Sequence, residues 1–125
     1  MSDCASTGFG GVRAHVARAG HHLAARFDLG GGAVGGLAAR PSNPNSDHPR
    51  GLALDFPAGR VLGDALSGHV LDHRTELAAR YVIWRQRINF GDGWEPMADR
   101  GGDTANHMNH VHVSFDATPG AGLPC

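Results

Sequence analysis

Apolar residues recur at helical spacing in two segments of the chain. Between Gly11 and Phe27, steps of three or four positions join the apolar residues Val12, Val16, Ala19, Leu23 and Phe27. This is the spacing of one helical face and predicts a first helix. The glycines at 30–32 then end that helix. A second helix is predicted after Pro57 from a similar apolar series: Val61, Leu62, Ala65, Leu66, Val70 and Leu71.

Four other segments have the pattern of strands. In residues 52–56 large apolar side chains alternate with Ala53 and Asp55, so Asp55 is expected on the face opposite the core. Residues 110–115 also alternate, which places His110 and His112 on one face of a last strand.

The other two predicted strands lack that alternation. The β-branched and aromatic run 81–84 indicates a buried strand that extends towards Ile88 and Phe90. The small residues at 33–39 predict a further short strand.

Two loops lead to histidines. Pro, Asn and Ser residues at 40–46 predict a loop that delivers the chain to His48. Residues 91–109 form the longest stretch without periodicity, and a segment of this kind in a small domain is usually functional. It contains His107 and leads directly into the strand that carries His110.

Composition and charge narrow the class of protein. At 125 residues, we expect a single domain, 1–125, and a monomer is the working expectation. The 19 glycines predict many loops, whereas 41% hydrophobic and 18% charged residues predict a compact chain. With 11 basic and 12 acidic side chains, the chain lacks the basic field of a nucleic-acid-binding protein. No run of about 18 apolar residues predicts a membrane span.

The two cysteines, Cys4 and Cys125, stand near opposite ends of the chain. Because the termini of domains often lie close together, these residues either form a disulfide or remain as two unpaired thiols. A disulfide would place the protein outside the cytoplasm.

Three residues have the types and spacing of a catalytic zinc site. His48 and Asp55 lie seven positions apart, and Gly51 between them allows a loop to turn into a strand. His112 would add a third ligand from the last strand. Two imidazoles and one carboxylate suit Zn²⁺ and leave its fourth tetrahedral position open for water or substrate.

The segments around these residues resemble a known family. Residues 46–55, read as Ser-Asp-His-Pro-Arg-Gly-Leu-Ala-Leu-Asp, and the motif His110-Val111-His112 resemble the D-alanyl-D-alanine carboxypeptidase and L-alanyl-D-glutamate endopeptidase group of zinc peptidases. The resemblance implies the hedgehog/D,D-peptidase fold, which is an α+β domain whose small antiparallel sheet carries the zinc and is flanked by two or three helices. The predicted order of elements is compatible with it.

A second resemblance covers more of the chain. Residues 81–88 and the segment from Thr104 to Phe115 resemble a C-terminal domain of actinobacterial secreted proteins, with similarity over about residues 10–116. It implies the same three ligands, His48, Asp55 and His112.

The resemblance also implies roles for three further residues. His110 matches the first histidine of His-x-His and would move a proton or stabilise the transition state. His107 matches a histidine that some members place nearby. Arg40 resembles an arginine that stabilises the oxyanion, although the segment before it is longer here.

One family motif is missing from this chain. The Glu-x-Trp-His motif, whose Glu is the general base in one branch of the family, does not occur. His110 is therefore the first choice for the base, followed by Asp99, Glu95 or a metal hydroxide acting alone.

These features together predict zinc-dependent hydrolysis of a peptide bond in a peptidoglycan stem peptide or cross-link, by a secreted or cell-wall protein. Trp84, Trp94 and residues 91–109 are candidate walls of the groove, although the apolar run around Trp84 favours the core for it. The alternatives are a zinc-stabilised wall-binding module without catalysis and, more remotely, a metal-dependent nuclease. No function is expected for the histidines in or near the helices, which are His15, His21, His22, His69 and His73.

Overall fold

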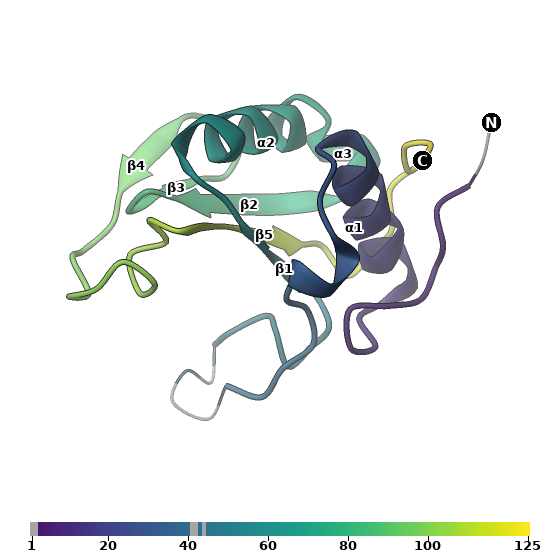
Figure 1. Cartoon of the computed structure of the whole chain (residues 1–125), viewed down its shortest axis with the longest axis horizontal. Coiled ribbons are helices and arrows are strands. Elements are labelled where there is room, and N and C mark those ends of the chain that lie inside the picture. Colours follow the sequence, from purple (N-terminus) through teal and green to yellow (C-terminus); the bar gives the residue numbers. More distant parts are fainter. Residues whose placement is uncertain (1–2, 41–42, 44) are drawn as a thin grey trace.

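The helices and strands follow the predicted order along most of the chain (Figure 1). The computed structural model describes residues 3–40, 43 and 45–125. Parts of the predicted domain 1–125 and of the predicted loop 40–46 therefore lie outside the described residues. The elements are α1 (Ala14–Arg26), the 3₁₀ helix η1 (Gly31–Ala33), β1 (Ala53–Pro57), α2 (Arg60–Asp72), α3 (Arg74–Leu77), β2 (Ala79–Trp84), β3 (Arg87–Asn89), β4 (Trp94–Pro96) and β5 (His110–Phe115).

The strands form one antiparallel sheet in the order β1-β5-β2-β3-β4. The last strand in the sequence, β5, lies between β1 and β2, so its register decides which residues of these three strands are neighbours. Asp55 on β1 and Ile83 on β2 both pair with His112 on β5. The fold is thus α+β with a small antiparallel sheet, as expected.

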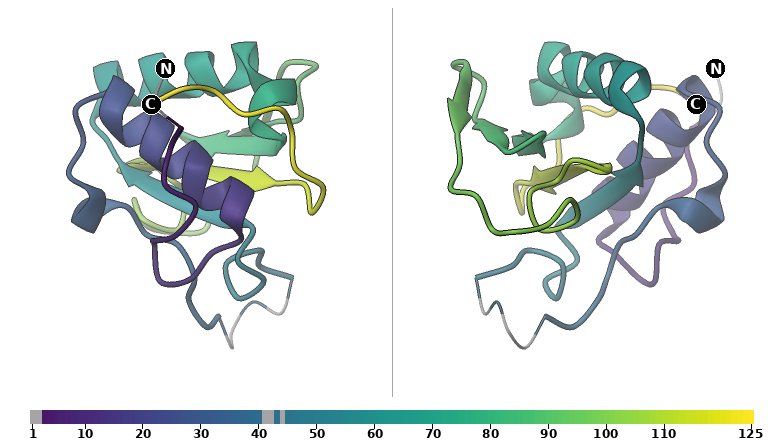
Figure 2. Two further views of the ribbon diagram at one scale, coloured as in Figure 1. Left: turned by 90° about the vertical axis from the view of Figure 1, so that its right-hand side faces the viewer. Right: turned by 60° about the vertical axis from the view of Figure 1, so that its left-hand side comes forward.

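The helices α1 and α2 cover one face of this sheet (Figures 1 and 2). Leu54 and Phe56 of β1 are fully buried in the core together with Val111 and Val113 of β5. The intervening side chains, including Asp55, therefore lie on the other face. The alternation predicted for both strands is confirmed, because a residue and its second neighbour share a face.

Trp84 lies in the core, as its apolar surroundings favoured. Its side chain is fully buried, and its indole Nε1–H donates a hydrogen bond of 2.9 Å to Asp64 on α2. The helix approaches so closely here that a Cβ added at Gly63 would collide with the indole ring. Gly63 therefore sets the distance between α2 and the sheet.

The prediction of a strand at 33–39 is wrong. The segment contains η1 and a single bridge, in which Gly35 exchanges two backbone hydrogen bonds with Asp55 of β1. Gly36 then passes so close to Phe9 that any side chain would collide with its carbonyl oxygen. The small residues allow this close passage, and they lack the β-branched side chains that stabilise a longer strand.

The extension of the 81–84 strand towards Phe90 is also wrong. The chain reverses at Arg85 and Gln86, both with positive φ, as in the tight turns that join two antiparallel strands. Ile88 consequently lies on the neighbouring strand β3. The short elements α3 and β4 were not predicted, since four and three residues are too few to establish a periodicity.

The two ends of the described chain are joined. Cys4 and Cys125 form a disulfide with their Cα atoms 5.1 Å apart, so the bridged alternative is the correct one. Among the described residues, no helix has both the length and the apolar character needed to cross a membrane.

Candidate metal centre

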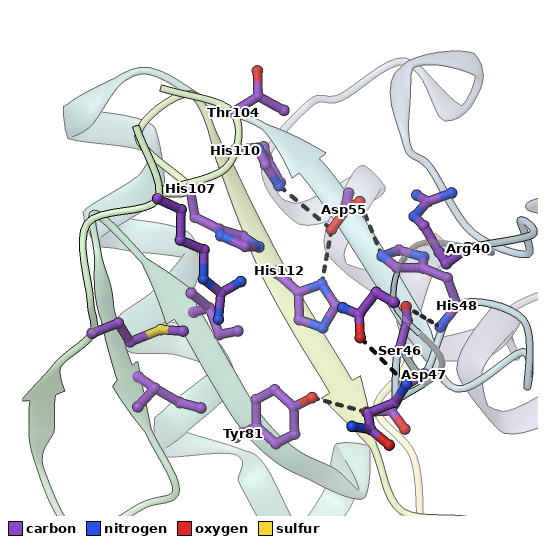
Figure 3. Close-up of a pocket in the computed structure, with 16 residues that line it drawn as sticks. Arg40, Ser46, Asp47, His48, Asp55, Tyr81, Thr104, His107, His110 and His112 are labelled. Carbon is purple, nitrogen blue, oxygen red and sulfur yellow. Dashed lines mark hydrogen bonds and ion pairs between the residues drawn. The ribbon is translucent and has the colours of Figure 1, made fainter. Parts of the chain in front are cut away.

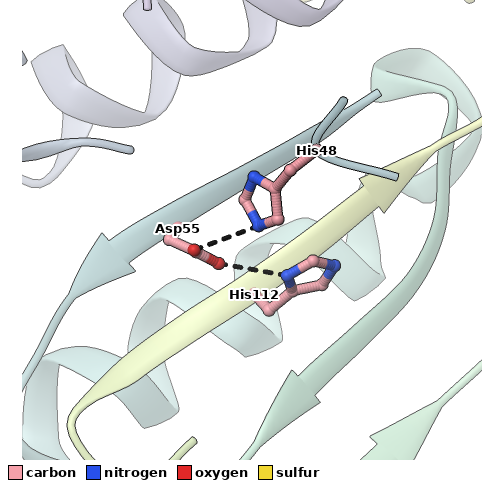
Figure 4. Close-up of side chains that lie close together, drawn as sticks. All are labelled: His48, Asp55 and His112. Carbon is pink, nitrogen blue, oxygen red and sulfur yellow. Dashed lines mark hydrogen bonds and ion pairs between the residues drawn. The ribbon is translucent and has the colours of Figure 1, made fainter. Parts of the chain in front are cut away.

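His48, Asp55 and His112 converge on one point of the open sheet face (Figure 4). Asp55 Oδ2 lies 3.0 Å from His48 Nε2, and Asp55 Oδ1 lies 3.0 Å from His112 Nδ1. The β1–β5 register sets the second distance, because it pairs Asp55 with His112. The ligand atoms all lie within 4.8 Å of one another, so the three residues can hold a metal ion.

A tight turn delivers His48 to the sheet. Gly51 N–H donates to the His48 carbonyl and Leu52 N–H donates to the Asp47 carbonyl, both at 3.1 Å. Gly51 has a φ of 70°, in the left-handed region that favours glycine. The turn that the sequence predicted between His48 and Asp55 is confirmed.

The distal nitrogen of each imidazole has a fixed partner. His48 Nδ1–H donates to the Gly36 carbonyl at 2.8 Å, and His112 Nε2 lies 2.7 Å from Ser114 Oγ. Metal-binding histidines usually make such contacts, because they fix the tautomer and aim the free nitrogen at the ion. His48 would therefore bind through Nε2 and His112 through Nδ1, which fits the donor set to a metal ion.

The sequence did not indicate three residues that support the His112 side of the centre: Asp47, Tyr81 and Ser114. Tyr81 Oη–H donates to Asp47 Oδ2 at 2.9 Å, and the Tyr81 ring lies parallel to that of His112 at 5.9 Å between centroids. Tyr81 pairs with Ser114 in the β2–β5 register. Ser114 could have been found from its place two residues after His112 on the same strand face, whereas only the register identifies Tyr81.

Asp55 carries a negative charge between the two imidazoles. Burial raises its pKa, but hydrogen bonds with His112 and His48 outweigh burial and hold the pKa far below its usual range. Burial lowers the pKa of His48, and the hydrogen bond and charge of Asp55 outweigh it, so that this pKa is raised. The carboxylate therefore remains ionised under all ordinary conditions and favours a positive charge at the centre.

His110 lies beside the three candidate ligands. Its Nε2 is 3.8 Å from Asp55 Oδ1, and its Nδ1 is 2.9 Å from Asn109 Oδ1. The Asn109 amide donates in turn to Thr104 Oγ1 at 3.1 Å, so its oxygen faces the imidazole and Nδ1 carries the hydrogen. Burial and the nearby imidazoles lower the pKa of His110, which leaves Nε2 unprotonated near neutral pH.

The His107 ring packs against that of His110 at a tilt of 38°, with ring centroids 4.5 Å apart. Burial and the charges of His110 and His112 lower the pKa of His107 to about 4. The turn at Arg85 and Gln86 holds its loop, because Arg85 N–H donates to the His107 carbonyl at 2.8 Å. The structure thus brings His107 to the centre, as predicted.

These residues line an open pocket of about 510 Å³ (Figure 3). Arg40 is half-buried at its rim, and its guanidinium donates to the Ala39 carbonyl at 3.1 Å. The aperiodic segment contributes Met97, Arg100 and Thr104 to the wall, as expected of residues 91–109.

Four other candidates do not line this pocket. Trp84 is in the core, and Trp94 lines a separate hollow beside Asp64 and Arg87, because β4 lies at the far edge of the sheet. Glu95 is exposed on β4. Asp99 is exposed and braces its own loop by accepting hydrogen bonds from Gly101 N–H and the Asn106 amide, both at 2.8 Å. Asp99 and Glu95 are therefore not placed to act as the base.

Comparison with known proteins identifies a family. No curated protein and no solved structure matches the chain. A family model described as "VldE, C-terminal domain" matches residues 8–108, which include His48 and Asp55 and end just before β5. Because this match covers most of the chain, the protein belongs to the family of the VldE C-terminal domain.

Proposed function

We propose that this domain is a zinc-dependent peptidase that hydrolyses a peptide bond in bacterial peptidoglycan. The observation that carries the proposal is the group His48, Asp55 and His112 at an open pocket, with His110 Nε2 3.8 Å from Asp55 Oδ1 beside it. Two imidazoles and a carboxylate suit zinc, and three protein ligands are typical of catalytic rather than structural sites.

The ion, when bound, would polarise the scissile carbonyl and lower the pKa of water. His110 Nε2 faces the same point and would accept a proton from the attacking water, then return it to the departing amine. Asn109 and Thr104 hold the imidazole in the tautomer that this step requires. His107 packs against His110 and limits the movement of its ring.

The remaining lining residues would bind the peptide. Arg40 lies at the rim, where its donors can reach an oxygen that gains negative charge during the reaction. Ile83, Ile88 and Met97 provide an apolar wall for small side chains. Peptidoglycan is proposed as the substrate because residues 46–55 and 110–112 resemble the motifs of zinc peptidases that cut it. The disulfide is compatible with a protein that acts outside the cell.

A zinc-stabilised module that binds the cell wall without cutting it is the second candidate. One feature of the pocket favours it: Asp47 and Asp55 are the acidic residues among the described residues that line the pocket, and both are already engaged. No further carboxylate is therefore placed there as a general base.

Incubation with peptidoglycan and defined stem peptides tests the proposal. The zinc-loaded protein should generate new amino termini, detected by labelling and by fragment mass. Removal of the ion by a chelator and the His110→Ala variant should each abolish them. A matched His21→Ala variant should retain full activity, because His21 hydrogen-bonds to the Thr7 carbonyl and packs against Phe9, and neither residue lines the pocket.

Two results would contradict the peptidase. Peptides that stay intact beside zinc-loaded protein, while peptidoglycan sediments the protein, would establish the binding module instead. Full activity of His110→Ala would remove His110 from the mechanism.

A further inference from the structure

Three histidines that the metal centre does not use meet at the junction of the helices. His22 lies on α1, His69 lies in the last turn of α2, and His73 lies between α2 and α3. The His22 and His69 rings are stacked with centroids 5.2 Å apart, and the His69 and His73 centroids are 4.6 Å apart. His22 and His69 belong to α1 and α2, the helices that cover the face of the sheet opposite Asp55 and His112 (Figure 1). We call the three residues the histidine cluster.

The hydrogen bonds at the edge of the cluster leave the Nε2 lone pairs of His22 and His73 available. His22 Nδ1 lies 2.6 Å from the Pro124 carbonyl, and His73 Nδ1 lies 2.9 Å from Glu76 Oε2. Since carbonyl and carboxylate oxygens only accept, each Nδ1 carries a hydrogen, and the neutral ring bears its lone pair on Nε2. A histidine whose Nδ1–H is held by such an oxygen has the usual arrangement of a metal ligand.

His22 Nε2 lies 2.9 Å from His69 Nε2. Two ligands of one tetrahedral ion, with bonds of about 2.0–2.1 Å, are separated by roughly 3.4 Å. Because His22 Nε2 bears a lone pair, His69 Nε2 donates the hydrogen between them in the metal-free protein. An ion would replace this hydrogen after the two nitrogens move apart by about half an ångström. Burial and the neighbouring charges, including that of Arg26, lower the pKa of His69 to about 4, so its ring is neutral near pH 7.

His69 and His73 are four residues apart, a spacing at which two histidines on one side of a helix can bind the same metal ion. His73 N–H donates to the His69 carbonyl at 3.1 Å, so the two residues lie one turn apart on one side of the helix. The His22 and His69 Nε2 atoms are already within about half an ångström of ligand spacing. The His73 side chain is 37% exposed, and it would rotate its Nε2 towards the pair by giving up its hydrogen bond with Glu76.

We propose that His22, His69 and His73 form a second site for a divalent transition metal of the class that imidazole binds well, such as Zn²⁺. His22 and His69 provide the initial pair of ligands and His73 completes the site. The ion would connect α1, the end of α2 and, through the Pro124 carbonyl, the C-terminal segment next to the disulfide. The site is independent of the pocket and of any peptidase activity.

Equilibrium dialysis of the disulfide-bonded protein against Zn²⁺, with the bound metal counted by mass spectrometry, tests this site. Wild-type protein should bind one more equivalent than His69→Ala. His73→Ala should bind that equivalent at least tenfold more weakly. The matched His21→Ala variant should keep it unchanged, since it removes a neighbouring helical histidine outside the cluster.

NMR of the histidine ring nitrogens distinguishes the proposed site from the pocket centre. It also tests the wild-type protein directly, so the result does not depend on a variant that folds poorly. In the intact wild-type protein, Zn²⁺ should shift the Nε2 signals of His22 and His69 together. In His112→Ala, which disrupts the pocket centre, the same shift should persist. Equal stoichiometry in wild type and His69→Ala, or a Zn²⁺ titration that leaves the His22 signal unmoved, would overturn the proposal.

Discussion

Replacing Ser114 by alanine tests how the metal centre is held. Ser114 is fully buried, and its Oγ lies 2.7 Å from His112 Nε2. When His112 binds an ion through Nδ1, its Nε2 carries a hydrogen and donates to this hydroxyl. The Ser114→Ala variant would leave that N–H buried without an acceptor.

Two independent arguments give the expected loss of metal-binding free energy in Ser114→Ala. A buried donor without a partner costs about 1–3 kcal/mol. Loss of the residue that orients a metal-binding histidine typically weakens metal binding by about 10–100-fold, which corresponds to about 1.4–2.8 kcal/mol. We therefore expect Zn²⁺ affinity at His48, Asp55 and His112 to fall by one to two orders of magnitude.

Competition with a chelator of known affinity measures this change, with the His48 and His112 ring signals followed by NMR. Ser67→Ala is the matched control, because Ser67 is also a buried serine and donates a 2.6 Å hydrogen bond to the Gly63 carbonyl within α2. It should leave Zn²⁺ affinity at this centre unchanged. Wild-type affinity in Ser114→Ala would refute the role assigned to Ser114.

Two further outcomes are expected in the metal-free protein. Because the pKa of His107 is about 4 in the folded state against an ordinary value of 6.5, the unfolded state binds more protons between these values, and stability falls as pH drops through this window. For a half-buried ring the loss is about 1–3 kcal/mol. Because His69 also has a lowered pKa, urea unfolding should show a decline in both proteins that is smaller by this amount in His107→Gln than in wild type. Parallel pH profiles would contradict it. Removal of the Cys4–Cys125 disulfide, across a sequence separation of 121 residues, should lower the free energy of unfolding by about 4–5 kcal/mol by freeing the unfolded chain. Urea midpoints of the wild type and of the double Cys→Ser variant that coincide would show that the disulfide contributes nothing.

Much of the candidate site follows from local patterns. The alternation at 52–56 and 110–115 predicted which faces of their strands carry Asp55, His110 and His112. The side chain of a strand residue points to a face determined by the chain itself, so this inference needs no knowledge of the partner strand. Gly51 similarly predicted the turn after His48, because a positive φ is a local property.

Local patterns misplace residues where the chain turns back or loses periodicity. Residues 81–90 were predicted as one strand, yet the turn at Arg85 and Gln86 divides them. Trp94 was predicted as a pocket wall, yet β4 forms the edge of the sheet away from the centre. Both errors concern the direction of the chain, which apolar content does not encode.

The sequence alone determined the residue types of the centre, the strand faces that bear Asp55 and His112, and the loop that carries His48. The tertiary structure decided what those residues contact. The antiparallel register of β5 with β1 and β2 brings Asp55 to His112 and sets Tyr81 beside it, and helix packing brings His22 to His69. These pairs lie up to 57 positions apart along the chain, and the burial of the apolar faces, rather than any local preference of their own residues, places them together.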